Sequence, residues 1–69
     1  MAVRETETYP VPGASNPDLH VCVVEVTDPG VGLHVVYEVH CYRCWTFDTY
    51  EQRSAAELAG ANHDCQAVA

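Results

Sequence analysis

The sequence of 69 residues contains no lysine and only three arginines, Arg4, Arg43 and Arg53, against ten aspartates and glutamates. A protein that grips nucleic acid without sequence preference needs clustered cations to displace the counterions of the phosphates. The formal net charge of −7 therefore disfavours binding to nucleic acid and to anionic membrane surfaces. We expect the acidity to keep a small protein soluble or to complement a basic partner protein.

Long apolar runs are also missing. The chain shows neither a charged segment leading into an apolar one, as in a signal peptide, nor the roughly 20 apolar residues of a membrane span. With Met1 at its start, we expect a cytoplasmic protein, whose thiols stay reduced. The sequence contains no glycine-rich phosphate loop and no nucleophile elbow, so we predict that it is not an enzyme.

The N-terminal quarter has few large apolar side chains that could form a core. Residues 1–18, MAVRETETYPVPGASNPD, carry three prolines and a glycine among small or polar residues, which is typical of an extended or flexible arm. Within it, ETETY is compatible with a short edge strand. Residues 19–69 are then a single small domain, and a chain of this size often needs a metal, disulfides or oligomerisation to fold.

Two valine-rich segments, 19–28 and 33–41, flank the turn residues Pro29-Gly30-Val31-Gly32 and predict a β-hairpin. With a four-residue loop, Thr27 lies opposite Gly32. Directly opposed residues share a face of the sheet, so this register predicts one nearly apolar face, made of His20, Cys22, Val24, Val26, Leu33, Val35, Tyr37 and Val39.

Residues 45–51, WTFDTYE, alternate in a pattern that predicts a third strand with Trp45 and Phe47 in the core. Ser54-Ala-Ala-Glu57 has the form of a capping box and predicts a helix over about 54–62 that lays Ala55 and Leu58 on the sheet. Gly60 within it costs roughly 1 kcal/mol relative to alanine, so the helix must depend on docking. The predicted fold is α+β: a three-stranded antiparallel sheet and a C-terminal helix, in the order β-β-β-α.

The four cysteines and their histidine neighbours suggest a metal site. Cys41 and Cys44 form a C-x-x-C pair, whose spacing lets two thiolates converge on one zinc ion. His63 and Cys65 follow the predicted helix and complete four ligands. Residues two apart on a helix point about 200° apart, so the helix must end near Asn62 for both to face one metal.

Other ligand sets remain open. If only one of His63 and Cys65 is a ligand, His20 is the reserve, because the predicted register places it diagonal to Cys41 on the same face. Cys22 is too far along its strand and is expected to be a small buried residue. His34 is expected in solvent and His40 on the face away from Cys41. A disulfide between cysteines, free thiols and thiol redox chemistry are the alternatives to a metal.

The segments HCYRCWTF and SAAELAGANHDC resemble small zinc-ribbon or treble-clef-like proteins of actinobacteria and their phages, over residues 33–65. The resemblance implies a structural zinc ion and no catalysis, although the His-x-Cys spacing is narrower than in those proteins.

From these features we expect an acidic, zinc-stabilised protein–protein interaction module, an accessory or regulatory protein that acts on a host protein. A second copy of the chain is another partner that an unpaired edge strand would suit. The alternatives are a disulfide-stapled structural component of a particle or surface, and a nucleic-acid-binding zinc finger.

Overall fold

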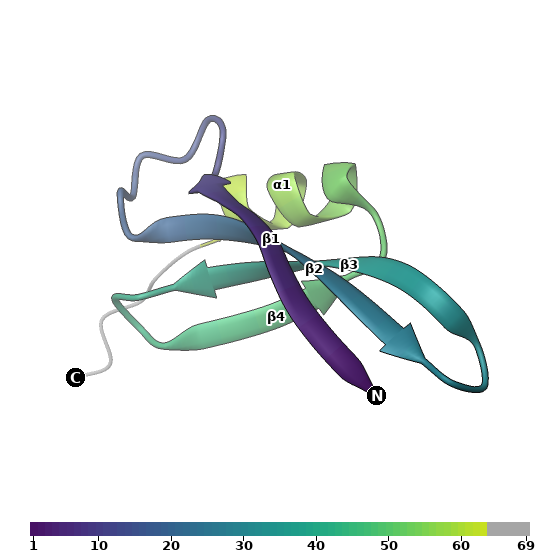
Figure 1. Ribbon diagram of the computed structural model, residues 1–69. Helices are drawn as coiled ribbons and strands as arrows, with labels where there is room; N and C mark the ends of the chain where they lie inside the picture. The colour runs from purple at the N-terminus through teal and green to yellow at the C-terminus, as the bar shows by residue number, and fades with distance from the viewer. Residues whose placement is uncertain (64–69) are drawn as a thin grey trace.

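The computed structural model describes residues 1–63 and shows a four-stranded antiparallel sheet with one helix (Figure 1). Strands β1 (Ala2–Pro10), β2 (Leu19–Asp28), β3 (Gly32–Cys41) and β4 (Thr46–Tyr50) lie in the sheet in sequence order, and helix α1 (Arg53–Ala61) follows. The α+β class and the C-terminal helix are confirmed. The predicted count of three strands is one too low.

The additional strand is β1, an edge strand within the segment expected to be an arm; it includes and extends the ETETY stretch that is compatible with a short edge strand. It pairs with β2 from Ala2 opposite Thr27 to Pro10 opposite His20, with a bulge between Glu5 and Glu7. Nearly all its side chains are exposed. The polar, proline-containing composition wrongly predicted an arm over these residues. An edge strand is held by backbone hydrogen bonds to its neighbour and does not need apolar side chains of its own. Within residues 1–18, the stretch outside the sheet is Met1 and the loop 11–18.

The β2–β3 hairpin forms as predicted, but its register differs by one residue. Asp28, not Thr27, lies opposite Gly32. The Val31 amide donates to the Asp28 carbonyl at 3.1 Å and the Gly30 amide to the Asp28 carboxylate at 2.9 Å, and Gly32 follows with a φ of +94°. This is a three-residue loop, and the residue after it has a left-handed conformation that glycine adopts without strain.

Because side chains alternate along a strand, a one-residue shift moves one strand's set to the other face. His20 therefore lies opposite His40, and Leu19 opposite Cys41. The predicted apolar face does not exist as a unit. We call the two observed faces the helix face, with Leu19, Val21, Val39 and Cys41, and the open face, with His20, Cys22, Glu38, His40 and Phe47.

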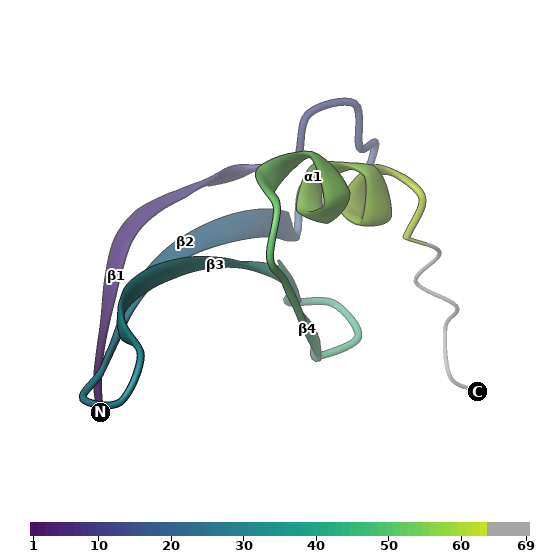
Figure 2. The ribbon, with the colours of Figure 1, turned by 90° about the vertical axis from the view of Figure 1, so that its right-hand side faces the viewer.

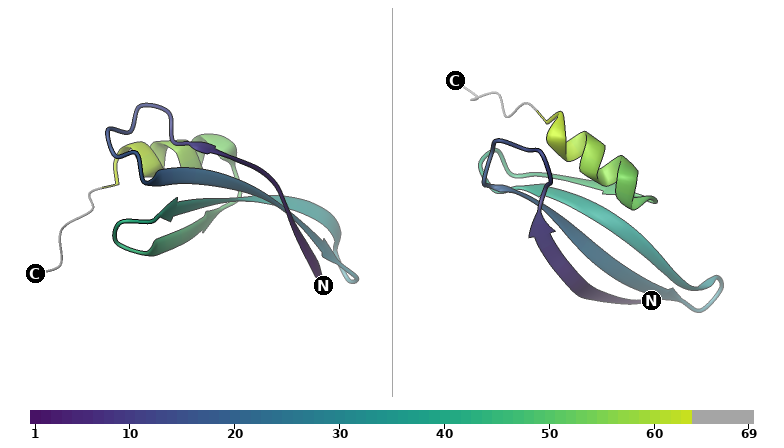
Figure 3. Two further views of the ribbon diagram at one scale, coloured as in Figure 1. Left: turned by 60° about the vertical axis from the view of Figure 1, so that its left-hand side comes forward. Right: turned by 90° about the horizontal axis from the view of Figure 1, so that it is seen from above.

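Helix α1 covers only the helix face, where it contacts β2, β3 and β4 (Figure 2). The sheet is bent and twisted, and the end that carries the β2–β3 hairpin extends past the helix (Figures 2 and 3). The core lies between helix and sheet and is closed by the 11–18 loop; its buried members are Val11, Leu19, Val21, Val39, Cys41 and Ala56.

The helix begins one residue before the predicted capping serine. Gln52 is its N-cap residue and makes no side-chain cap hydrogen bond, so the capping box is wrong. Glu57 instead accepts a hydrogen bond from the Tyr9 hydroxyl at 2.6 Å. The predicted buried stripe is also wrong, because Ala56 and Gly60 are buried whereas Leu58 is 65% exposed.

The contact of Gly60 with Val11 explains why a different side of the helix from the predicted one faces the sheet. A Cβ atom at position 60 would lie 2.8 Å from both methyl carbons of Val11, a distance at which the atoms overlap. The absence of a side chain lets α1 approach the 11–18 loop closely and turns the Ala56 and Gly60 side of the helix inward. The helix therefore depends on docking, which offsets the poor helix propensity of glycine.

Candidate metal centre

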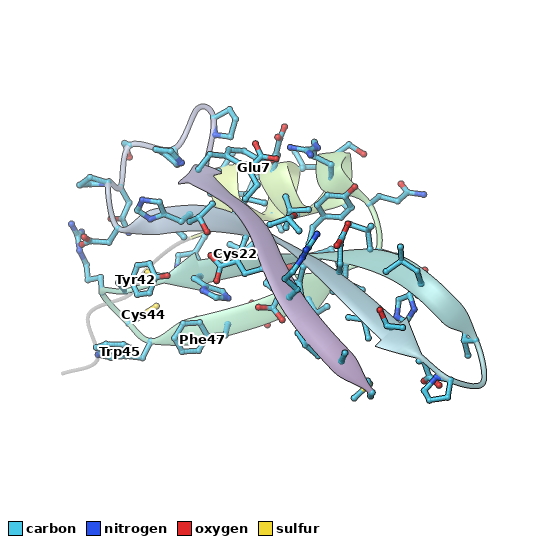
Figure 4. The ribbon with its side chains drawn as sticks, viewed as in Figure 1. Glu7, Cys22, Tyr42, Cys44, Trp45 and Phe47 are labelled. Carbon is cyan, nitrogen blue, oxygen red and sulfur yellow. The ribbon has the colours of Figure 1, made fainter. Side chains whose placement is uncertain are left out.

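Three of the four predicted ligands come together at one end of the helix face. Single donor atoms of Cys41, Cys44 and His63 all lie within 4.8 Å of one another. Cys41 is buried, while Cys44 and His63 are half-buried. Cys44 lies in the β3–β4 turn, at one end of the sheet (Figure 4). The fourth predicted ligand, Cys65, lies outside the described residues.

Cys41 and Cys44 are positioned by the end of β3 and the turn that follows. Cys41 is the last residue of β3, and the next amide, that of Tyr42, donates to the Asp18 carbonyl at 3.0 Å. Cys44 lies in the turn before β4. The pairing of Cys41 with Thr46 across this turn brings both sulfur atoms to the helix face.

His63 reaches the cysteines because the helix ends where the ligand geometry requires. Ala61 is the last helical residue and Asn62 is the C-cap residue, as predicted. The His63 amide donates to the Gly60 carbonyl at 3.2 Å. Its Nε2 then lies 3.3 Å from the Cys44 sulfur.

Polar groups of neighbouring residues surround the two sulfur atoms. The Asn16 side-chain amide donates to Cys41 Sγ at 3.7 Å, and the Thr46 hydroxyl lies 3.0 Å from Cys44 Sγ. Hydrogen bonds of this kind orient ligands and stabilise thiolate charge. Two sulfur atoms and an imidazole nitrogen lie close enough to hold one metal ion, and thiolate and imidazole are among the ligands that Zn²⁺ takes in proteins.

The reserve ligand His20 was predicted from the wrong register. It lies on the open face, opposite His40, and its ring centroid is 5.7 Å from that of Tyr42. His20 is therefore on the face of the sheet away from Cys41. Its Nδ1 is buried without a hydrogen-bond partner among the described residues.

The other open-face residues behave largely as expected from the sequence. Cys22 is buried, with 1% of its surface exposed, and His34 is exposed. His40 lies on the face away from Cys41, as predicted. Sequence reasoning missed what His40 does there: its Nδ1 lies 3.4 Å from Cys22 Sγ and its Nε2 lies 2.9 Å from a Glu38 carboxylate oxygen.

This row of Cys22, His40 and Glu38 has the connectivity of a nucleophile, a base and an orienting acid. Burial raises the pKa of the Cys22 thiol, and a hydrogen bond from Thr8 counteracts this rise only in part. A thiol that is both buried and held in its neutral form is a poor nucleophile. The row instead fixes the His40 ring, whose Nδ1 also lies 3.3 Å from the Tyr42 hydroxyl.

Trp45 and Phe47 are not core residues, contrary to the sequence prediction. Strand β4 begins at Thr46, which leaves Trp45 in the turn with 70% of its surface exposed. Phe47 lies opposite His40 on the open face and is 52% exposed. With Tyr42, which is 43% exposed, they form a group of rings on the side of the sheet that α1 leaves uncovered. The alternating pattern predicted the strand, but the pairing of β4 with β3 decided which face Phe47 occupies.

No family model, curated protein or solved structure matches this chain. The fold and the Cys41, Cys44 and His63 group are therefore the basis for any functional inference. Within residues 1–63, no helix combines the length and the apolar character needed to cross a bilayer.

Proposed function

We propose that this chain is a small acidic protein-interaction module whose fold is held together by one structural zinc ion. The convergence of Cys41, Cys44 and His63 carries the proposal. These ligands come from a strand end, a turn and the residue after a helix, so an ion among them ties α1 to the sheet. Cys65 supplies the fourth ligand in this proposal.

A filled set of four protein ligands leaves no coordination position for water or substrate, so the zinc ion would be structural. The small core supports the need for it, because the buried cluster between helix and sheet has six members among residues 1–63. Domains this small commonly require a metal or disulfides for stability. We place the protein in a reducing compartment such as the cytoplasm, where cysteines are available as thiolates for metal.

Binding of another protein is supported by the distribution of large apolar side chains. Trp45, Phe47 and Tyr42 are exposed together on one face, although aromatic side chains of this size normally stabilise a small protein by being buried. Contiguous exposed apolar groups of this kind are typical of interaction sites. The net charge of −7 disfavours nucleic acid as the partner.

Native mass spectrometry of protein purified without added metal or reductant tests the metal part of the proposal. We expect a mass excess of one zinc ion that is lost on treatment with chelator or acid, together with loss of the near-UV circular dichroism signal of the folded state. A mass deficit corresponding to disulfides, without metal, would contradict the proposal and favour the disulfide-stapled alternative.

A further inference from the structure

The open face near the β3–β4 turn carries a compact group of aromatic rings, which we call the aromatic surface: Tyr42, Trp45 and Phe47 (Figure 4). The centroids of their rings are 6.3 to 6.4 Å apart, and the rings are steeply inclined to one another, by 60° to 86°. The His40 ring packs edge-on against Phe47, with centroids 4.8 Å apart.

Trp45 occupies a backbone position that is unfavourable for tryptophan. Its φ of +58° makes it the one non-glycine residue with positive φ within residues 1–63. Bulky residues in this left-handed region cost on the order of 1 kcal/mol, whereas glycine adopts it freely. The only tryptophan of the sequence thus lies where glycine would suit the fold better, and it is 70% exposed. Burial does not explain its presence there, and strain of this kind points to function.

The arrangement of the rings suits a cation. Because the three centroids form a nearly equilateral triangle, a charged group placed over its centre lies within roughly 6 Å of all three centroids, the distance at which a cation over a ring face is attracted to it. A guanidinium group can in addition stack on an aromatic face.

The charges around the aromatic surface are acidic, and the chain's own cations are engaged elsewhere. Glu38 lies beside it, with a carboxylate oxygen 2.9 Å from His40 Nε2, and the chain as a whole has a formal net charge of −7. The three arginines each pair with a carboxylate, as Arg4 with Glu25, Arg43 with Asp18 and Arg53 with Glu7. An arginine or lysine for the aromatic surface would therefore be supplied by a partner.

We propose that the aromatic surface docks a cationic segment of another protein, with arginine or lysine side chains seated on Tyr42, Trp45 and Phe47. This inference rests on the proposed function for the class of partner and adds its chemistry and its site. The metal group and the aromatic surface share one turn, because Cys41 and Cys44 bracket Tyr42 and Trp45 follows directly. Metal binding would thus fix the rings, and their binding affinity should depend on metal.

The test uses the metal-loaded full chain and two synthetic peptides, one of alternating arginine and alanine and one in which glutamine replaces every arginine. Because Trp45 is the only tryptophan, its intrinsic fluorescence reports directly on the proposed site, and calorimetry gives the affinity. We expect the arginine peptide to change the fluorescence and to bind at least roughly tenfold more tightly than the glutamine peptide, a difference of about 1.4 kcal/mol.

Variants separate cation–π docking from general attraction to an acidic protein. Trp45→Gly and Phe47→Ala keep the net charge, and we expect each to lower the affinity for the arginine peptide by roughly tenfold. Trp45→Gly should leave the thermal transition at least as high as in the wild type, since glycine relieves the positive φ. Leu58→Ala is the matched control: Leu58 is an equally exposed apolar residue, but on α1, and its loss should leave peptide binding unchanged.

Several results would overturn the inference. They are equal binding of both peptides, arginine-peptide binding that survives Trp45→Gly, binding of a single-stranded oligothymidylate instead, or a dimer that Trp45→Gly dissociates. Native mass spectrometry of the same sample reports the metal independently. Bound zinc without peptide binding would reject the aromatic docking site alone, whereas absence of zinc would reject the proposed structural metal whatever the peptides do.

Discussion

The two faces of the sheet meet at the β3–β4 turn and differ in what they bury. On the helix face, Cys41 is 1% exposed and its sulfur lies among polar groups and the end of α1. On the open face, the same short segment displays Tyr42 and Trp45 to solvent. Within residues 41–45, Cys41 and Cys44 lie with His63 at the end of the helix, whereas Tyr42 and Trp45 are exposed and lie against each other. The comparison shows that one short turn places a candidate metal group on one side of the sheet and exposed aromatic rings on the other.

If the metal group on the helix face stabilises the fold, Cys41→Ser should lower the free energy of unfolding more than any other substitution considered. Structural zinc contributes apparent binding free energies of about 10–16 kcal/mol in small domains, as much as the whole free energy of unfolding of a typical protein. We expect the variant to lose its bound metal and its cooperative thermal transition, as followed by circular dichroism.

The matched control for Cys41→Ser is Cys22→Ala, which removes an equally buried thiol from the open face. We expect a folded, metal-bound protein that is destabilised by roughly 0.5–3 kcal/mol, as is common for single substitutions. A Cys41→Ser protein with a thermal transition like that of the wild type would show that the two faces do not differ in this way.

The next effect concerns the close contact between α1 and the 11–18 loop. Gly60→Ala adds a Cβ atom 2.8 Å from both Val11 methyl carbons. We expect a net destabilisation of about 1–3 kcal/mol, because this overlap outweighs the gain in helix propensity of roughly 1 kcal/mol. Denaturant midpoints measure it.

A double-mutant cycle with Val11→Ala shows whether the overlap is the cause. The combined variant should regain part of the stability that Gly60→Ala loses, since the smaller residue makes room for the new methyl group. Additive effects of the two substitutions would contradict the contact as described.

A smaller effect is expected from Tyr9→Phe, which removes a link between β1 and α1. The Tyr9 hydroxyl donates to Glu57 at 2.6 Å and accepts from Arg53 at 3.0 Å. We expect a loss of about 1 kcal/mol at neutral pH, measured by denaturant unfolding. An unchanged free energy of unfolding would mean that this link does not stabilise the docking of the helix.

The same hydroxyl predicts a pH dependence. Desolvation, and then the hydrogen bond to Glu57, raise the pKa of Tyr9 above its usual value of 10.0. A raised pKa in the folded state means that the contribution of the neutral phenol to stability is present below pH 10 and is lost as the pH rises through the folded-state pKa. The difference in the free energy of unfolding between wild type and Tyr9→Phe should therefore shrink at strongly alkaline pH.

The smallest effect is expected from Leu58→Ala. Although leucine is the largest apolar residue of α1, its side chain lies in solvent, so the substitution should change the free energy of unfolding by less than about 0.5 kcal/mol. A loss of 2 kcal/mol or more, the cost of truncating a buried leucine, would mean that Leu58 packs against the sheet and that the helix is rotated from the position described.

Local sequence signals predicted the hairpin, the third strand of the predicted sheet and the end of the helix, because turn residues and strand-forming runs act over a few positions. The C-x-x-C spacing and the placement of His63 after the helix also predicted three residues that the structure brings together. The predictions failed where the result depended on the register between paired strands or on the packing of the helix against the rest of the chain. The face assignment of His20 depended on one residue of hairpin register, and that of Phe47 on the pairing of β4 with β3.

The sequence by itself determined that this is a small acidic α+β protein with a cysteine–histidine group at the turn between two strands. Only the tertiary structure decided which side of the sheet each residue faces. The β2–β3 pairing closes a three-residue loop before Gly32, which has a positive φ, and places His20 opposite His40 on the face away from Cys41. Gly60, in contact with Val11, turned Leu58 outward. Both outcomes depend on backbone conformation and close packing, which the period of apolar residues does not encode.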